Sequence, residues 1–163
     1  MNEGPIGAGE QDPGGDRFTI SFDDEQHVPV DVPSLLRVAR RALEMLSVPD
    51  GAALAVTFVE PSRMAELKEG ALGERAPTDV LAFPMDDVDD PMPGQVVVGD
   101  VVICPEVAEE QARAAAHSPG DELSLLLVHG ILHCLGRDHA TPEDERAMFA
   151  EQAEILAAAG AAL

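Results

Sequence analysis

Three of the five histidines in this chain lie within the eleven-residue segment HGILHCLGRDH at 129–139. His129 and His133 are four residues apart, so a helix would place both imidazoles on one face, one turn from each other. Gly136 can adopt the left-handed backbone that reverses the chain, and His139 can then return as a third ligand. Three imidazoles that leave one coordination position open are typical of catalytic zinc sites, whereas structural sites are closed by four protein ligands. The spacing predicts a catalytic metal site for one zinc ion per chain, with nickel or iron as alternatives.

The helix that carries the first two histidines is predicted to be buried. Between Leu125 and Leu135 the side chains are apolar on nearly every face, which is the pattern of a core helix. A polar ring is costly to bury there, and a bound metal ion would satisfy one nitrogen of each imidazole. The alternative is a set of core histidines that each bond a backbone carbonyl, which their shared spacing disfavours. Cys134 would face away from the His129/His133 pair and is interpreted as a small core residue.

Two helix caps frame this segment. The sequences SPGD at 118–121 and TPED at 141–144 each resemble a capping box at a helix start. They predict one helix that runs from Ser118 into the histidines and ends near Gly136, and a last helix that starts at Thr141. Upstream, the hydrophobic pattern predicts strands at 18–22, 54–59, 78–83 and 96–103, and helices at 34–46, 61–70 and 105–116.

A glycine and an aspartate in one predicted strand, and three arginines on one predicted helix, could each mark a ligand site. Gly99 and Asp100 interrupt the β-branched strand at 96–103, which predicts a bulge or a close approach of a ligand to the backbone. Arg37, Arg40 and Arg41 lie on the polar side of the helix at 34–46. We interpret them as a solvated face rather than a phosphate site.

Length and composition are typical of one globular domain. The chain has 163 residues, of which 45% are hydrophobic. Residues 1–16 are Gly-rich and acidic and contain no Lys or Arg, which predicts a disordered leader before a single domain at 17–163. The apolar runs are too short to span a bilayer, and the N-terminus has no basic or apolar region of a signal peptide. We therefore expect a cytoplasmic protein that makes no membrane contact.

The net charge restricts the partners of the chain. Its 31 acidic and 10 basic residues give a formal net charge of −21, and no basic stripe offsets this acidity. A polyanion is repelled by such a surface, so the charge argues against tight, unaided binding of RNA.

The histidine spacing matches the metzincin protease signature H-E-x-x-H-x-x-G-x-x-H in all elements but one. Where those proteases carry the glutamate that acts as general base, this chain has Gly130. The usual peptidase base is therefore missing, although the metal ligands are shared.

Three ordered motifs resemble the YbeY family of bacterial endoribonucleases. The segment at 129–139 matches the family pattern H-G-x-L-H-x-x-G-x-D-H, which includes Gly130, Leu132 and Asp138 beside the three histidines. PTDVLAFP at 77–84 is similar to the family's P-T-[DN]-V-[LM]-S-F-P, and GDVVICP at 99–105 is similar to its G-D-[IV]-V-[IL]-C segment. The resemblance extends over about residues 17–157.

This resemblance implies a fold and an activity. The expected fold is α+β, with a mixed sheet of about four strands packed with about five helices and a zincin-like metal-binding helix. The three histidines are then zinc ligands. The implied activity is cleavage of single-stranded RNA in the maturation of small-subunit ribosomal RNA and in ribosome quality control. The implied partners are the ribosome, a ribosomal protein or a GTPase.

The chain departs from the family at two positions. The Tyr-Arg pair that many members carry, and that is implicated in catalysis, falls on Ala71 and Leu72, and the family's serine before Phe-Pro is Ala82. The remaining cations near the site are Lys68, Arg75 and Arg137.

We assign the catalytic cation to Arg137, because it lies in the metal-binding turn and a guanidinium can bind two phosphate oxygens at once. Asp138 is the second catalytic candidate. It could orient a ligating imidazole, or it could cap the end of the helix.

The sequence leaves two alternative functions. A metallopeptidase or another metallohydrolase could use the same three histidines, although Gly130 argues against the former. A non-catalytic ribosome assembly factor could use the metal structurally. Aromatic residues make up 3% of the chain, so few side chains are available to stack on bases.

Overall fold

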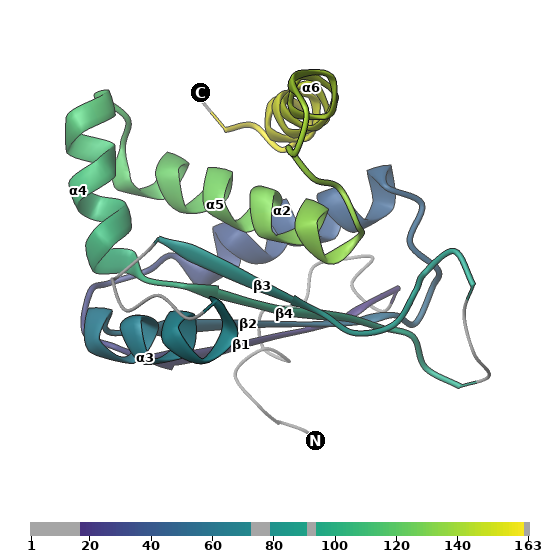
Figure 1. The fold of residues 1–163 in the computed structure, drawn as a ribbon, viewed down its shortest axis with the longest axis horizontal. Helices are drawn as coiled ribbons and strands as arrows, with labels where there is room; N and C mark the ends of the chain where they lie inside the picture. The colour runs from purple at the N-terminus through teal and green to yellow at the C-terminus, as the bar shows by residue number, and fades with distance from the viewer. Residues whose placement is uncertain (1–16, 73–78, 91–93, 162–163) are drawn as a thin grey trace.

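The computed structural model describes residues 17–72, 79–90 and 94–161 (Figure 1). Within them the chain forms a four-stranded mixed sheet and five helices, which confirms the predicted α+β class. The predicted leader at 1–16 lies outside the described residues. Among the described helices, none is long and apolar enough to cross a membrane.

The sheet has three parallel strands and one antiparallel edge strand. Its order is β1 (Thr19–Glu25), β2 (Ala53–Val59), β4 (Val97–Ile103) and β3 (Val80–Pro84), and β3 alone runs antiparallel to its neighbour. The sequence predicts a strand that stops before Pro84, but β3 includes this residue. Proline is tolerated there because the outer side of an edge strand has no ladder hydrogen bond to donate.

The helices cover both faces of the sheet. In Figure 1, α2 and α5 lie on one face, α3 lies on the other, and α6 lies over α5 on the side away from the sheet. Helix α5 contacts the sheet and three other helices, so it is the central element of the fold. The five helices are α2 (Val32–Met45), α3 (Pro61–Leu72), α4 (Pro105–Ala115), α5 (Pro119–Cys134) and α6 (Pro142–Ala158).

Helix α2 begins two residues before its predicted start because Asp31 caps it. The Asp31 carboxylate accepts hydrogen bonds from the Ser34 backbone N–H at 3.2 Å and from the Ser34 hydroxyl at 2.7 Å. Both bonds favour the charged form and hold the pKa of Asp31 below its usual value. On the polar side of the helix, Arg37 and Arg41 are exposed, as expected for a solvated face, whereas Arg40 is half-buried and forms an ion pair with Glu44 at 2.6 Å.

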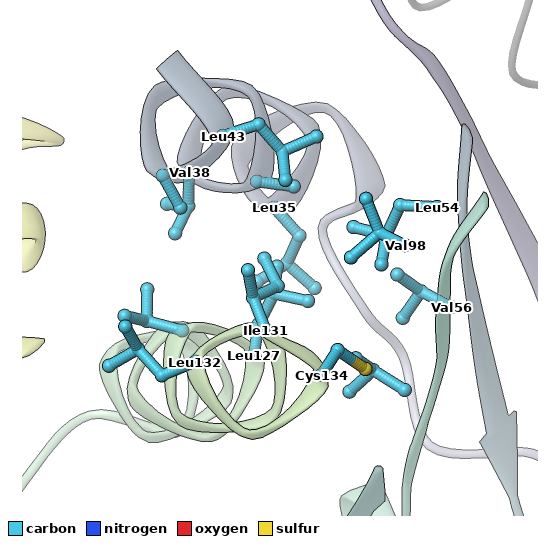
Figure 2. Close-up of a cluster of buried hydrophobic side chains, with 14 of the residues drawn as sticks. Leu35, Val38, Leu43, Leu54, Val56, Val98, Leu127, Ile131, Leu132 and Cys134 are labelled. Atoms are coloured by element: carbon cyan, nitrogen blue, oxygen red, sulfur yellow. The ribbon is translucent and has the colours of Figure 1, made fainter. Parts of the chain in front are cut away.

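The core lies between α2, α5 and the sheet. Figure 2 shows Leu127 and Ile131 of α5 between side chains of α2, such as Leu35, and the strand residues Leu54 and Val98. Leu127 and Ile131 are both fully buried. This packing explains why almost the whole circumference of α5 is apolar: one side meets the sheet while others meet α2, α4 and α6.

The predicted bulge in β4 is confirmed at Gly99. The register of the β2–β4 pair shifts there, so that Ala53 pairs with Val97 but Leu54 pairs with Gly99. Gly99 has a φ of +152°, and a Cβ atom on it would lie 2.5 Å from the Phe83 carbonyl oxygen and 2.9 Å from Cys134 Sγ. The close approach to this backbone therefore comes from β3 and α5 rather than from a ligand.

Candidate metal centre

Helix α5 begins and ends where the sequence predicts. Its N-cap Ser118 accepts a hydrogen bond from the Asp121 backbone N–H at 3.1 Å. At the other end Gly136 has a φ of +88° and donates to the His133 carbonyl at 3.0 Å, while Arg137 N–H donates to the Leu132 carbonyl at 2.9 Å. These two bonds form a Schellman motif, which turns the chain back toward the helix.

The turn brings the three predicted ligands together. The Nε2 atoms of His129 and His133 lie 3.1 Å apart. The His139 ring centroid lies 6.0 Å from that of His129 and 5.4 Å from that of His133. One nitrogen from each of the three rings lies within 4.8 Å of the others. His129 and His133 are half-buried and His139 is exposed, so the cluster is open to solvent on one side.

This arrangement fits a transition metal. Two ligand nitrogens of a tetrahedral zinc site with bonds of about 2.0 Å lie about 3.3 Å apart, close to the separation of the two Nε2 atoms. Burial, together with the neighbouring His129 and His139, lowers the pKa of His133, which favours the neutral imidazole that a metal needs. The three histidines could therefore hold one metal ion through nitrogen atoms, with a position left open.

Gln152 of α6 fixes the orientation of His129, and the sequence analysis missed it. Its Oε1 lies 3.0 Å from His129 Nδ1. An amide oxygen only accepts hydrogen bonds, so Nδ1 carries the proton and Nε2 presents its lone pair to the cluster. Gln152 is 23 residues from His129, and no spacing rule connects residues on different helices at this separation.

Arg137, the predicted catalytic cation, forms a two-point ion pair with Glu151 of α6. Its Nε and one terminal nitrogen each lie 3.1 Å from a carboxylate oxygen of Glu151. Its other terminal nitrogen donates to the Leu135 carbonyl at 3.3 Å. The ion pair raises the pKa of Arg137. Two consecutive residues of α6 therefore contact the site: Glu151 binds Arg137 in the turn, and Gln152 binds His129.

Asp138, the second predicted catalytic residue, is exposed and bonds locally. Its Oδ1 accepts a hydrogen bond from the backbone N–H of His139 at 2.7 Å. The contact supports the backbone of the third ligand rather than its ring. Of the other candidate cations, Lys68 lies on α3, and Arg75 lies outside the described part of the chain, as does the side chain of Leu72.

Gly130 is required by packing, which explains the absence of a glutamate at this position. It lies on the side of α5 that meets β4, where an added Cβ would be 2.6 Å from Val101 Cγ1. A longer side chain here would collide with Val101 of the sheet. The metzincin-like spacing thus provides the ligands but no room for the peptidase base.

The prediction that Cys134 is a small core residue is confirmed. Cys104 and Cys134 are buried free thiols. His27 is exposed and forms an ion pair with Glu60 at 2.9 Å, close to Glu106. These three residues form a second group with metal-ligand chemistry, but the ion pair between an imidazolium and two carboxylates already accounts for their arrangement.

Comparisons with known proteins agree with this geometry. The family model described as endoribonuclease YbeY matches residues 20–160. The endoribonuclease YbeY of Salinispora tropica is 48% identical over 149 residues, which cover 86% of this chain and 95% of the relative. That of Beutenbergia cavernae is 49% identical over 143 residues, covering 85% and 95%.

A solved structure has a similar fold. The solution structure of TM1509 from Thermotoga maritima aligns with a TM-score of 0.59 and 26% identity, and the alignment covers 87% of this chain and 88% of that one.

Proposed function

The chain belongs to the endoribonuclease YbeY family, and from this premise we propose that it is a zinc-dependent endoribonuclease specific for single-stranded RNA. Membership makes it a hydrolase that acts on RNA. The observation that supports metal dependence is the convergence of His129, His133 and His139, with the two Nε2 atoms 3.1 Å apart.

Each residue of the site has its own role in the proposed reaction. When bound, a zinc ion supplies Lewis acidity that polarises a phosphoryl oxygen and lowers the pKa of a water molecule. The three imidazoles would hold the ion, and Gln152 would keep Nε2 of His129 directed at it. Asp138 would support His139 through its backbone N–H. We assign to Arg137 the stabilisation of negative charge on the phosphate, for which it would exchange Glu151 for the substrate.

The same site is poorly suited to peptide hydrolysis. Peptidases with this histidine spacing need a carboxylate next to the first ligand, and Gly130 lies against Val101 instead. A solely structural role for the metal is disfavoured by the open, solvent-facing position beside His139. A peptidase would cleave casein, and a protein with a solely structural metal would cleave neither casein nor RNA.

We further propose that the substrate is a precursor of small-subunit ribosomal RNA, and that the protein acts in the cytoplasm on or near the ribosome. The net charge of −21 supports a partner, because such a chain binds naked RNA weakly. A basic ribosomal protein would attract this surface, and a ribosome-associated GTPase is the other candidate.

The test compares metal-free and zinc-loaded protein on single-stranded RNA, double-stranded RNA and casein. We expect cleavage of single-stranded RNA alone, by the zinc-loaded protein alone. His133→Ala should lose the metal and the activity together, whereas His117→Ala, a histidine outside the cluster, should keep both. Cleavage of casein, or undiminished RNA cleavage by metal-free protein, would overturn the proposal.

A further inference from the structure

An apolar groove runs between α5 and α6 beside the histidine cluster. Its volume is about 180 Å³, and none of the described residues that line it is charged. The absence of charge is notable in a chain with 31 acidic residues. The residues that line it include Leu125, Phe149, Gln152, Ala153, Leu156 and Ala157.

One residue, Gln152, connects this groove to the histidine cluster. On α5, Leu125 precedes His129 by four residues, so the two side chains lie on one face, one turn apart. On α6, Gln152 both lines the groove and bonds His129 Nδ1. A molecule that occupies the groove therefore contacts Gln152, the hydrogen-bond partner of His129.

Phe149 provides an exposed aromatic face in this groove. It is 46% exposed, whereas Phe18 and Phe58 are buried and Phe22 and Phe83 are half-buried. It lies three residues before Gln152, about one helical turn or 5 Å along α6. Proteins that bind single-stranded nucleic acid usually stack unpaired bases on exposed aromatic side chains.

Arg146 adds a free cation on the same side of α6. It precedes Phe149 by three residues, so both side chains lie on one face of the helix. Arg146 makes no ion pair or hydrogen bond with another residue in the part of the chain that the structure describes. Arg137, by contrast, is paired with Glu151. A guanidinium without a carboxylate partner is available to a phosphate.

We propose that the groove between α5 and α6 binds one unpaired base of an RNA strand, stacked on Phe149, while Arg146 binds a neighbouring phosphate. This proposal rests on the proposed function and names the subsite of the same reaction. RNA is favoured over a protein occupant because Gln152 links the groove to His129 of the cluster, where the strand that is cleaved must pass. The described lining itself adds no carboxylate that would repel a phosphate at this place.

The experiment is a double-mutant cycle between protein and ligand. The affinity of zinc-loaded protein for a short 2′-O-methyl oligonucleotide, labelled with a fluorophore and checked for integrity on a gel, is measured by anisotropy at low salt. An abasic residue is then moved along the oligonucleotide position by position. The protein variants are Phe149→Ala and Phe149→Tyr, with Met85→Ala as the control, since Met85 is 57% exposed on a different part of the surface.

We expect Phe149→Ala to weaken binding about tenfold or more, and Phe149→Tyr and Met85→Ala to leave it nearly unchanged. One abasic position should weaken binding to the wild type by a similar factor and have little further effect on Phe149→Ala. Arg146→Ala should reduce the slope of log affinity against log salt by about 0.7, and Arg113→Ala on α4 serves as its control. All variants should keep zinc and the wild-type melting temperature.

Equal affinities of the wild type and Phe149→Ala at every abasic position would overturn the proposal. If the wild type still cleaves RNA in a zinc-dependent manner, the proposed function stands and only the subsite is wrong. If the wild type binds RNA without cleaving it, the proposed function fails, and the cycle still decides the subsite. A change from dimer to monomer on Phe149→Ala at constant RNA affinity would show that a second copy occupies the groove.

Discussion

Gln152 Oε1 lies 3.0 Å from His129 Nδ1, so helix α6 decides which nitrogen of His129 faces the histidine cluster. The same helix contacts the metal-binding turn through Glu151 and Arg137. Helix α6 therefore supports the metal centre from outside the histidine motif.

The first prediction concerns this support. Gln152→Leu removes the acceptor for His129 Nδ1 and should weaken zinc affinity about 10–100-fold, as measured by competition with a chromogenic chelator. Gln152→Glu keeps an acceptor and should retain the affinity. The melting temperature of the metal-free protein is the control for folding. Equal zinc affinities in the wild type and Gln152→Leu would show that α6 does not orient the ligand.

A second prediction separates two roles of Arg137. If it stabilises charge on the phosphate, Arg137→Ala should keep zinc and slow RNA cleavage by about a hundredfold. Glu151→Ala frees the guanidinium and should not reproduce this loss. If the ion pair only anchors the turn, both variants should lower cleavage and the melting temperature equally. The measurement is the cleavage rate at saturating RNA together with the melting curve of each variant.

Two glycines in α5 provide a matched pair for stability. Gly130→Ala would place a Cβ 2.6 Å from Val101 Cγ1 and should lower the free energy of unfolding by about 1–3 kcal/mol. Gly120→Ala, at a position with nothing within 4 Å, should not lower it. In a Val101→Ala background the cost at Gly130 should decrease, because the methyl groups that collide are gone. Urea denaturation measures the wild type, the three single variants and the double variant, and equal effects at both glycines would contradict the packing argument.

The buried thiol of Cys134 predicts a dependence on pH. Burial, and after it the nearby Asp100, raises the pKa of Cys134 to about 12. The unfolded thiol ionises near its usual value of about 8.5, so between these two values only the unfolded state releases the proton. Its contribution to stability is therefore complete below pH 8.5 and decreases as the pH rises toward 12.

We expect native protein at pH 8 to resist alkylation by iodoacetamide, as followed by mass spectrometry, and the unfolded protein to react at both cysteines. Cys134→Ala should lose less stability than the wild type when the pH is raised above 9. Rapid labelling of Cys134 in the native state would refute this account.

Local patterns predicted much of this fold. The spacing of apolar residues identified each described strand and helix to within a few residues, and the two N-caps at Ser118 and Thr141 form as expected. The order of the strands did not follow from those patterns. It depends on which faces pack together, which is a property of the whole chain.

The sequence by itself determined the clustering of the three histidines, because they and Gly136 lie on one helix and its terminal turn, where local geometry relates them. Only the tertiary structure decided what surrounds them. Gln152 and Glu151 reach the centre across 23 and 14 residues, and Gly130 is small because β4 passes beneath it. Residues that touch across separate elements have no regular spacing in the sequence, because their contact arises from the packing of one element against another.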